Sequence, residues 1–413
     1  MTVTRRGVLA GLGAVTAATF PVRAELVEAL PFSPPPQGRQ PFDEPRANGG
    51  KSPVRRALDA AAAAPPSEAL RLLDGLTAAT TSERLDLEAA REGLAADLAL
   101  QGATGPARFA LLLRRQLGDV DPAAARSRIE REHARVAARA DGLFRAIGVP
   151  RGSTGERYRQ LWRDERFLYP DTGAGRTQAV ADMNRALDLV RPRLAGWFGP
   201  LPPYVFAVEA RRMSPADEAE RRGGYREVPS PAKPGGYFVD LADIRRRPSW
   251  TLPGVVHHEL LPGHMVQFPL EEAAAPHPLR LRYAPAFPEG WAVYAETLPR
   301  HASPHDELGH LHWLLFRLCR ARADLGIHLD GWSVDQARAR LGEWQGKPAY
   351  FAPFETDLPR IAAEPATRTA EALAWLAIAD AARGRRGAAL ARCHRALLAH
   401  GRTRLSAIRR SAA

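Results

Sequence analysis

The residues with the most capacity for chemistry lie between His258 and His264. Zinc hydrolases commonly place two histidines four residues apart on one helix, where they bind one metal ion while an adjacent glutamate polarises a water. Here Glu259 follows His258, but the second histidine comes six residues after the first. On an unbroken helix the two rings would point roughly 240° apart and stand ~9 Å apart along the axis. They can share a metal ion only if the helix is distorted between them.

Pro262 and Gly263 provide a reason for such a distortion. Proline removes a helical hydrogen bond, and glycine adopts backbone conformations closed to other residues. We therefore expect a local bulge that swings His264 back toward His258. His257 is seven residues from His264 and would stand ~10 Å from it on the same face. We expect His257 to support the metal ligands from behind.

Further acidic residues follow in the segment that begins at Glu289. A carboxylate from a neighbouring helix is what a two-histidine site lacks for a three-ligand catalytic zinc with an open position for water. Glu296 comes seven residues after Glu289, which is two turns along the same helix face. An acid in that position can hold the N–H of a ligand histidine and fix its tautomer.

These motifs resemble those of a known family. His258-Glu259-x-x-Pro262-Gly263-His264 and Glu289-Gly290-Trp291-Ala292 are similar to the signatures of the bacterial domain of unknown function 885 (DUF885) family, which resembles metallopeptidases related to the gluzincins. The similarity extends from about residue 155 to the end. It implies a mainly helical, zincin-like fold, a Zn²⁺ cofactor, Glu289 as the third ligand and Glu259 as the general base.

The same resemblance implies candidates for the donor that would hold the oxyanion of the reaction. His328, Arg322 and Tyr350 each lie in a segment that the resemblance places near the cleft. Pro353 occupies a position where the family tends to have glycine, so the backbone beside Tyr350 departs from the family pattern. Asp324 stands four residues before His328, and this pair can equally brace a helix.

The rest of the chain indicates a mainly α protein with a small sheet. Apolar residues at three-to-four spacing predict helices from Pro53 to about Ile147, two more up to Phe198, and a helical pattern from residue 250 to the end. Short β-branched and aromatic stretches at 204–208 and 235–241 predict strands beside the active-site helix. We expect one helical metallohydrolase domain over 54–413. Its N-terminal helical part would be 54–150 and its catalytic part 151–413.

The N-terminus has the features of a targeting segment. Arg5 and Arg6 form a twin-arginine start before an apolar run too short to span a membrane, and Ala24 ends a small-residue cleavage pattern. This pattern predicts a Tat-type signal peptide over 1–24, recognised by the Tat export machinery. The proline-rich residues 25–53 predict an extended linker. The mature protein is then expected in the periplasm or outside the cell.

Charge and cysteine content exclude some classes of function. The net charge of +12 comes almost wholly from arginines that are scattered along the chain. The densest run, in the last thirty residues, has no interleaved aromatics, so we expect a solvated helix face and no nucleic-acid partner. Cys319 and Cys393 lie in apolar, helical contexts, which favours two free thiols.

The sequence thus predicts an exported zinc hydrolase that acts on a peptide or another amide-containing substrate. Two alternatives use the same residues. A 2-His-1-carboxylate Fe(II) oxygenase needs the same three ligands, although such enzymes usually have a β-rich barrel. A non-catalytic, metal-dependent binding protein needs only a structural site, but such sites normally have four ligands, usually with cysteine.

Overall fold

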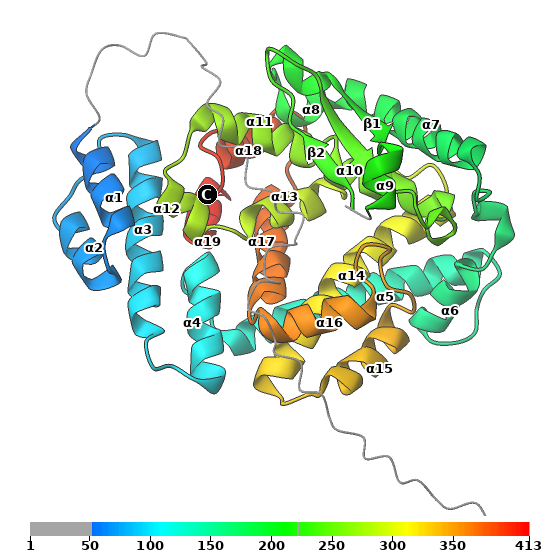
Figure 1. Ribbon diagram of the computed structural model, residues 1–413, viewed down its shortest axis with the longest axis horizontal. Coiled ribbons are helices and arrows are strands. Elements are labelled where there is room, and N and C mark those ends of the chain that lie inside the picture. Colours follow the sequence, from blue (N-terminus) through cyan, green and yellow to red (C-terminus); the bar gives the residue numbers. More distant parts are fainter. Residues whose placement is uncertain (1–51, 221–222, 413) are drawn as a thin grey trace, which may run out of the picture. The chain divides into compact units, whose positions relative to one another are not determined.

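The computed structural model describes residues 52–220 and 223–412, which belong to one compact unit (Figure 1). The predicted signal peptide over 1–24 and nearly all of the predicted linker over 25–53 lie outside these residues. Among the described residues, no helix is both long and apolar enough to cross a membrane.

Helices dominate the described residues, as the apolar periodicity predicts. The helices within residues 53–219 are α1 (Pro53–Ala63), α2 (Pro66–Leu73), α3 (Thr81–Ala99), α4 (Gly105–Leu117), α5 (Pro122–Ala146), α6 (Thr154–Leu161), α7 (Gly173–Val190), α8 (Leu194–Phe198) and α9 (Pro215–Ala219). The helices within residues 252–412 are α10 (Leu252–Glu259), α11 (His264–Ala274), α12 (Pro278–Tyr283), α13 (Phe287–Ala295), α14 (Pro304–Leu329), α15 (Val334–Trp344), α16 (Phe354–Ala363), α17 (Thr367–Ala382), α18 (Gly387–Leu398) and α19 (Leu405–Ala412).

Several helix starts are encoded locally. At α3 the Thr80 side chain accepts from the backbone N–H of Glu83, whose carboxylate accepts from the N–H of Thr80. Ser153 and Glu156 make the same reciprocal pair at α6. Each pair satisfies backbone N–H groups that the first helical turn leaves open, and a cap of this kind stabilises a helix by about 1 kcal/mol.

Three short strands form the small sheet in the order β1-β3-β2. β1 (Val208–Arg212) is parallel to β3 (Gly235–Val239), and β2 (Tyr225–Glu227) is antiparallel to β3. The strand predicted over 204–208 is wrong, because Pro203–Phe206 is a 3₁₀ helix and β1 begins only at Val208. Proline fixes a φ that suits the first turn of a helix, so the prolines before Tyr204 favour the turn.

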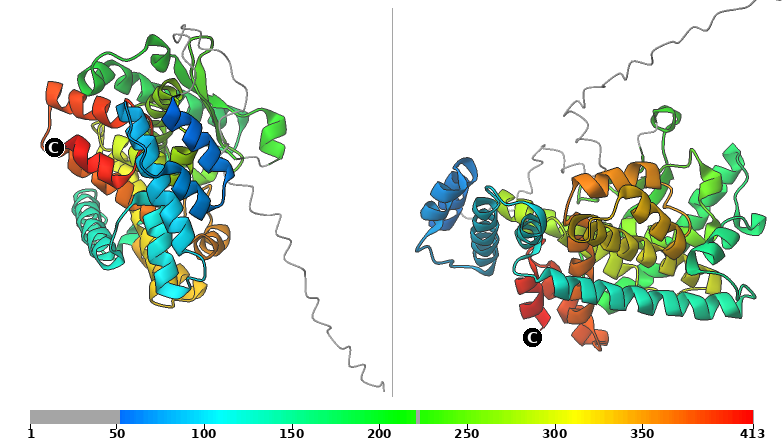
Figure 2. Two further views of the ribbon diagram at one scale, coloured as in Figure 1. Left: turned by 90° about the vertical axis from the view of Figure 1, so that its left-hand side faces the viewer. Right: turned by 90° about the horizontal axis from the view of Figure 1, so that it is seen from below.

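Helix α14 is central to the main hydrophobic core. It packs against α5, α17, α15, α16 and α10 (Figures 1 and 2). Most of its residues from Leu308 to Gly326 are buried. The main core includes residues from both predicted parts of the domain, such as Phe109 and Phe144 with Trp250 and Trp375. A second, smaller core joins α1, α2, α3 and α12.

The expectation that the C-terminal arginines form a solvated helix face holds only for part of them. Most of that run is exposed, but Arg402 and Arg404 are buried. The Arg402 guanidinium donates to both carboxylate oxygens of Glu271, and Arg404 donates to the Tyr283 carbonyl as well as to Glu92. These two side chains fix the end of the chain to α11 and α12. Both cysteines are buried and free, as predicted.

Candidate metal centre

The two histidines of the motif stand on different helices. α10 ends at Glu259 and α11 begins at His264, with the non-helical residues 260–263 between them. The bulge predicted within a single helix is therefore a complete break, with a cis peptide bond between Leu261 and Pro262. The break brings the ring centroids of His258 and His264 to 4.9 Å, with the ring planes at 89°. The six-residue spacing is thus compatible with a shared metal ion.

Gly263 permits the tight turn at this break. A Cβ atom at this position would lie 1.9 Å from the carbonyl oxygen of His258 and 2.5 Å from that of His257. Both contacts are with backbone atoms of α10, which cannot move aside without displacing the helix. The glycine therefore sets how closely α11 approaches the end of α10.

We expect Gly263→Ala to lower the free energy of unfolding by about 1–3 kcal/mol, the cost of overpacking a tight contact. Urea denaturation followed by circular dichroism measures this loss. Gly196→Ala, in an exposed helical position with no atom within 4 Å of the added Cβ, is the matched control and should be neutral or stabilising. Equal effects of the two substitutions would contradict this role of Gly263.

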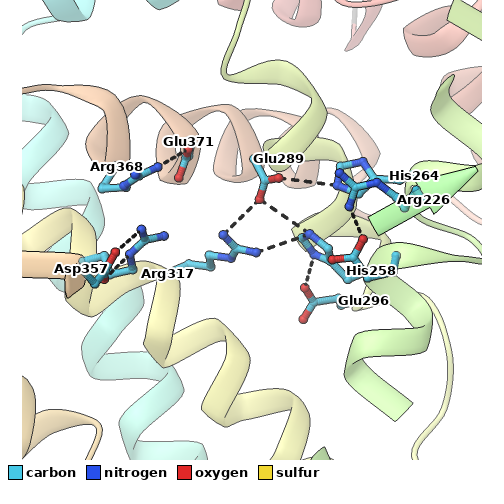
Figure 3. Close-up of polar contacts among 11 residues, drawn as sticks. Arg226, His258, His264, Glu289, Glu296, Arg317, Asp357, Arg368 and Glu371 are labelled. Carbon is cyan, nitrogen blue, oxygen red and sulfur yellow. Dashed lines mark hydrogen bonds and ion pairs between the residues drawn. The ribbon is translucent and has the colours of Figure 1, made fainter. Parts of the chain in front are cut away.

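Glu289 on α13 completes a cluster with the two histidines. One ligand atom from each of His258, His264 and Glu289 can be chosen so that all three lie within 4.8 Å of one another. The Nε2 atoms of His258 and His264 are 3.6 Å and 3.5 Å from the two carboxylate oxygens of Glu289. Figure 3 shows the three side chains pointing toward one another. The sequence predicted this set, and the structure brings its members together.

The donor atoms suit a divalent cation. The His264 ring is only 1% exposed, and neither of its nitrogens has a hydrogen-bond partner among the described residues. An unpaired buried nitrogen costs free energy unless a ligand satisfies it. Burial lowers the pKa of His264 to about 4, so the ring is neutral at pH 7 and offers a lone pair. Two imidazoles and one carboxylate form a ligand set typical of zinc.

Glu296 supports the cluster from behind. The Nδ1 atom of His258 donates to Oε1 of Glu296 at 2.8 Å, which leaves Nε2 as the acceptor that faces Glu289. His310 lies on the far side of Glu296, with its Nδ1 at 3.7 Å from Oε2. His257 is also buried, and its pKa is lowered to about 3 by burial and by His310. His257 does not join the three clustered ligands.

Two arginines at the cluster were missing from the sequence-based prediction. Arg317 on α14 donates to Oε2 of Glu289 at 3.0 Å and to Nε2 of His258 at 3.4 Å (Figure 3). Burial alone would raise the pKa of Glu289, but Arg317 and the histidines hold it well below its usual value. The guanidinium thus lies against lone pairs that would face a metal ion. Oε2 of Glu289 and Nε2 of His258 therefore already contact one cationic group, the guanidinium of Arg317.

Arg226 on β2 contacts the other acid of the motif. Its guanidinium forms an ion pair with the carboxylate of Glu259, the last residue of α10. Burial raises the pKa of Glu259, but Arg226, His258 and His264 together outweigh burial and lower that pKa below its usual value. Glu259 is therefore ionised at neutral pH. The small sheet lies beside the motif helix, as predicted, and this ion pair joins the two.

The proposed oxyanion donors on α14 lie elsewhere. Arg322 stacks over Trp344, with its guanidinium carbon 3.5 Å from the ring centroid, and contacts His133. His328 contacts the Ile361 carbonyl oxygen, with 3.0 Å between that oxygen and Nε2. Relative to Arg317, Arg322 is turned by about 140° around the helix and His328 is ~16 Å along the axis. We therefore do not retain either residue as an oxyanion donor.

The Asp324–His328 pair has a structural role in the contact between α14 and α17. Asp324 is fully buried and lies 3.7 Å from Nε2 of His328. Its carboxylate also accepts from the backbone N–H groups of Ala366 and Thr369 at the start of α17. The pair therefore braces the α14–α17 contact, which is the structural alternative noted from the sequence.

Tyr350 contacts another tyrosine, Tyr237 of the small sheet. Its hydroxyl lies 3.0 Å from the hydroxyl of Tyr237 on β3. Burial raises the pKa of Tyr237 well above its usual value, and the negative charge of Glu259 adds to that shift. Arg247 lies over the Tyr350 ring, 3.1 Å from its centroid. Tyr237 is therefore the phenol nearer to the motif, and Tyr350 orients it.

A family model described as "Bacterial protein of unknown function (DUF885)" matches residues 7–411. The chain belongs to this family. A comparison with curated proteins found no match to the chain. Two solved structures share the fold of this DUF885 protein, and both are described as a "putative lipoprotein". The one from Colwellia psychrerythraea is 24% identical, with a TM-score of 0.64 over 86% of this chain and 68% of that chain. The one from Shewanella oneidensis is 18% identical, with a TM-score of 0.60 over 86% of this chain and 72% of that chain.

Proposed function

We propose that this DUF885 protein is a zinc-dependent hydrolase of peptide bonds. The observation that carries the proposal is the convergence of His258, His264 and Glu289 beside the ionised carboxylate of Glu259. Three protein ligands leave a position open for water, which distinguishes a catalytic zinc site from a closed structural one. The proposed fold class is that of the zincin-like metallopeptidases.

Each side chain of the metal centre would have its own role. His258 and His264 would supply neutral nitrogens and Glu289 a carboxylate oxygen to the ion. Glu296 holds the His258 ring in the tautomer whose lone pair is on Nε2, the atom that faces Glu289. When bound, zinc supplies a Lewis acid that lowers the pKa of water and polarises a carbonyl oxygen.

Glu259 would act as the general base. Its carboxylate takes a proton from the attacking water, the hydroxide oxygen bonds to the carbonyl carbon, and the same proton then passes to the nitrogen of the leaving amine. The C–N bond breaks, so one water is added across it. Arg226 must release the carboxylate for this transfer, because an ion pair disfavours the protonated acid. Tyr237, which projects from the same sheet face as Arg226, is the candidate donor to the oxyanion.

We also propose that the protein acts outside the cytoplasm. The twin-arginine start supports export by the Tat machinery. The two solved structures of similar fold are described as lipoproteins, a class of exported protein. Export in the folded state would allow the metal ion to be loaded before the protein crosses the membrane.

A peptide library tests the hydrolase directly. We expect the zinc-loaded protein to cleave a mixed peptide library, and a chelator to abolish cleavage until zinc is restored. Mass spectrometry of the product ends reports whether cleavage is internal or terminal. Metal analysis of protein purified without added metal completes the test. Stoichiometric iron with oxygen-dependent turnover would instead identify an oxygenase, and zinc without turnover of any substrate would support a binding protein.

A further inference from the structure

The candidate metal centre has an excess of positive charge once a divalent ion is bound. Its carboxylates are Glu259, Glu289 and Glu296, and its guanidiniums are Arg226 and Arg317. Because a histidine binds a metal ion only as neutral imidazole, a bound divalent ion would leave one positive charge uncompensated. The partly buried setting strengthens the attraction of this charge for an anion. The site therefore favours a substrate that carries a negative group close to the bond that is cut.

Arg226 is the residue best placed to bind that group. Its side chain is 19% exposed, and that of its partner Glu259 is 18% exposed, so a small ligand can reach the pair from solvent. The guanidinium carbon also lies 5.7 Å from the ring centroid of Phe268 on α11. Arg226 pairs across the sheet with Tyr237, so both side chains project from the same face. This face carries the two side chains that approach Glu259.

The ion pair with Glu259 conflicts with the proposed chemistry. A general base needs a carboxylate oxygen that a water can reach, and the guanidinium of Arg226 occupies one oxygen of Glu259. An incoming carboxylate can replace Glu259 as the partner of Arg226, because the planar guanidinium binds any carboxylate through two parallel hydrogen bonds. The exchange keeps Arg226 paired and leaves the carboxylate of Glu259 without its guanidinium partner while substrate is present.

The position of β2 allows this exchange. β2 has three residues, and in the sheet that the described residues form it pairs with β3 and lies at one edge. Arg226 is its middle residue, and its long side chain reaches Glu259. A change of rotamer would move the guanidinium without disturbing α10, which carries the metal ligand His258.

We infer that Arg226 is a specificity residue that binds a carboxylate of the substrate. This inference rests on the proposed function. The substrate class is a peptide with a carboxylate next to the scissile bond, which the free C-terminus provides when the last residue is removed. The side chain of aspartate or glutamate is the other source of the same chemistry.

Two peptide libraries of identical sequence test the inference, one with free C-terminal carboxylates and one with C-terminal amides. We expect the zinc-loaded protein to cleave the free-acid library ~10–100-fold faster, the value of a charge-assisted hydrogen bond. Arg226→Gln should lower the free-acid rate toward the amide rate, and Arg226→Lys should retain part of the preference. Equal rates for the two libraries, or an equal loss of both in Arg226→Gln, would overturn the inference.

Arg212→Gln is the matched control. Arg212 lies at the end of β1 in the same sheet and forms a two-bond ion pair with Glu218, away from the metal centre. This variant should keep the preference for free acids. If only amides that end in aspartate or glutamate are cleaved as fast as free acids, carboxylate recognition holds and its source is the side chain.

A binding measurement separates this inference from the proposed function. If the zinc-loaded protein cleaves neither library, the hydrolase proposal fails. Equilibrium dialysis of the intact libraries then tests Arg226 alone. Preferential retention of free acids by the wild type, lost in Arg226→Gln, would support carboxylate binding, and equal retention of acids and amides would refute it.

Discussion

Replacing Glu259 with glutamine is expected to lower peptide hydrolysis by ~10²–10⁴-fold, the usual contribution of a positioned general base. Glutamine has nearly the same shape and can still accept a hydrogen bond from Arg226 through its amide oxygen. It cannot take a proton from water. Because Glu259 is not among the three clustered ligands, zinc content should be unchanged.

The test combines steady-state rates with metal content measured on the same preparation. Glu218→Gln is the matched control, because Glu218 also forms an ion pair with an arginine of the small sheet, at 2.9 Å. Its substitution should change neither rate nor zinc. Turnover of Glu259→Gln at the wild-type rate would reject Glu259 as the base. Loss of zinc from this variant would instead reassign Glu259 to the ligands.

The family and the mainly helical fold could be predicted because their signals are local. Helical periodicity and capping residues lie within one or two turns of each other, and the family match spans residues 7–411. Glu289 and Glu296 are separated by two turns of one helix, so their common face could be deduced from spacing. The juxtaposition of Glu296 with His258 follows from that deduction.

The arginines could not be predicted because their positions depend on tertiary contacts. Arg226 lies in a strand of three residues with no alternating pattern, and it meets Glu259 only because β2 pairs with β3. Arg317 reaches Glu289 from a long helix with several other arginines, and only packing decides which of them faces the cluster. In a protein with 58 basic residues, an arginine carries little information by itself.

The break between α10 and α11 could be predicted only in part. Proline and glycine indicate that a helix is interrupted, but they do not say whether it bulges or ends. Here α10 ends at Glu259 and a second helix begins at His264. Two helices can be oriented independently, which explains how histidines six residues apart can face one another.

Substitutions of the clustered acids are expected to separate metal ligands from supporting residues. Glu289→Gln should weaken zinc binding by at least ~100-fold, because it removes one of three ligand groups and leaves Arg317 without its carboxylate partner. Glu296→Gln should weaken zinc binding by only ~10–100-fold, as is usual for a group that orients a ligand histidine. Competition with a chromophoric chelator measures both affinities.

The ranking of the two variants is the decisive result, because both remove one negative charge from the same neighbourhood. If charge alone governed the affinity, Glu296→Gln would cost as much as Glu289→Gln, since Glu296 is the more buried of the two, with 3% of its side chain exposed against 26%. Direct ligation predicts the opposite order. A greater loss in Glu296→Gln would therefore reject Glu289 as a ligand, whereas unchanged affinity in both variants would place the metal ion elsewhere in the protein.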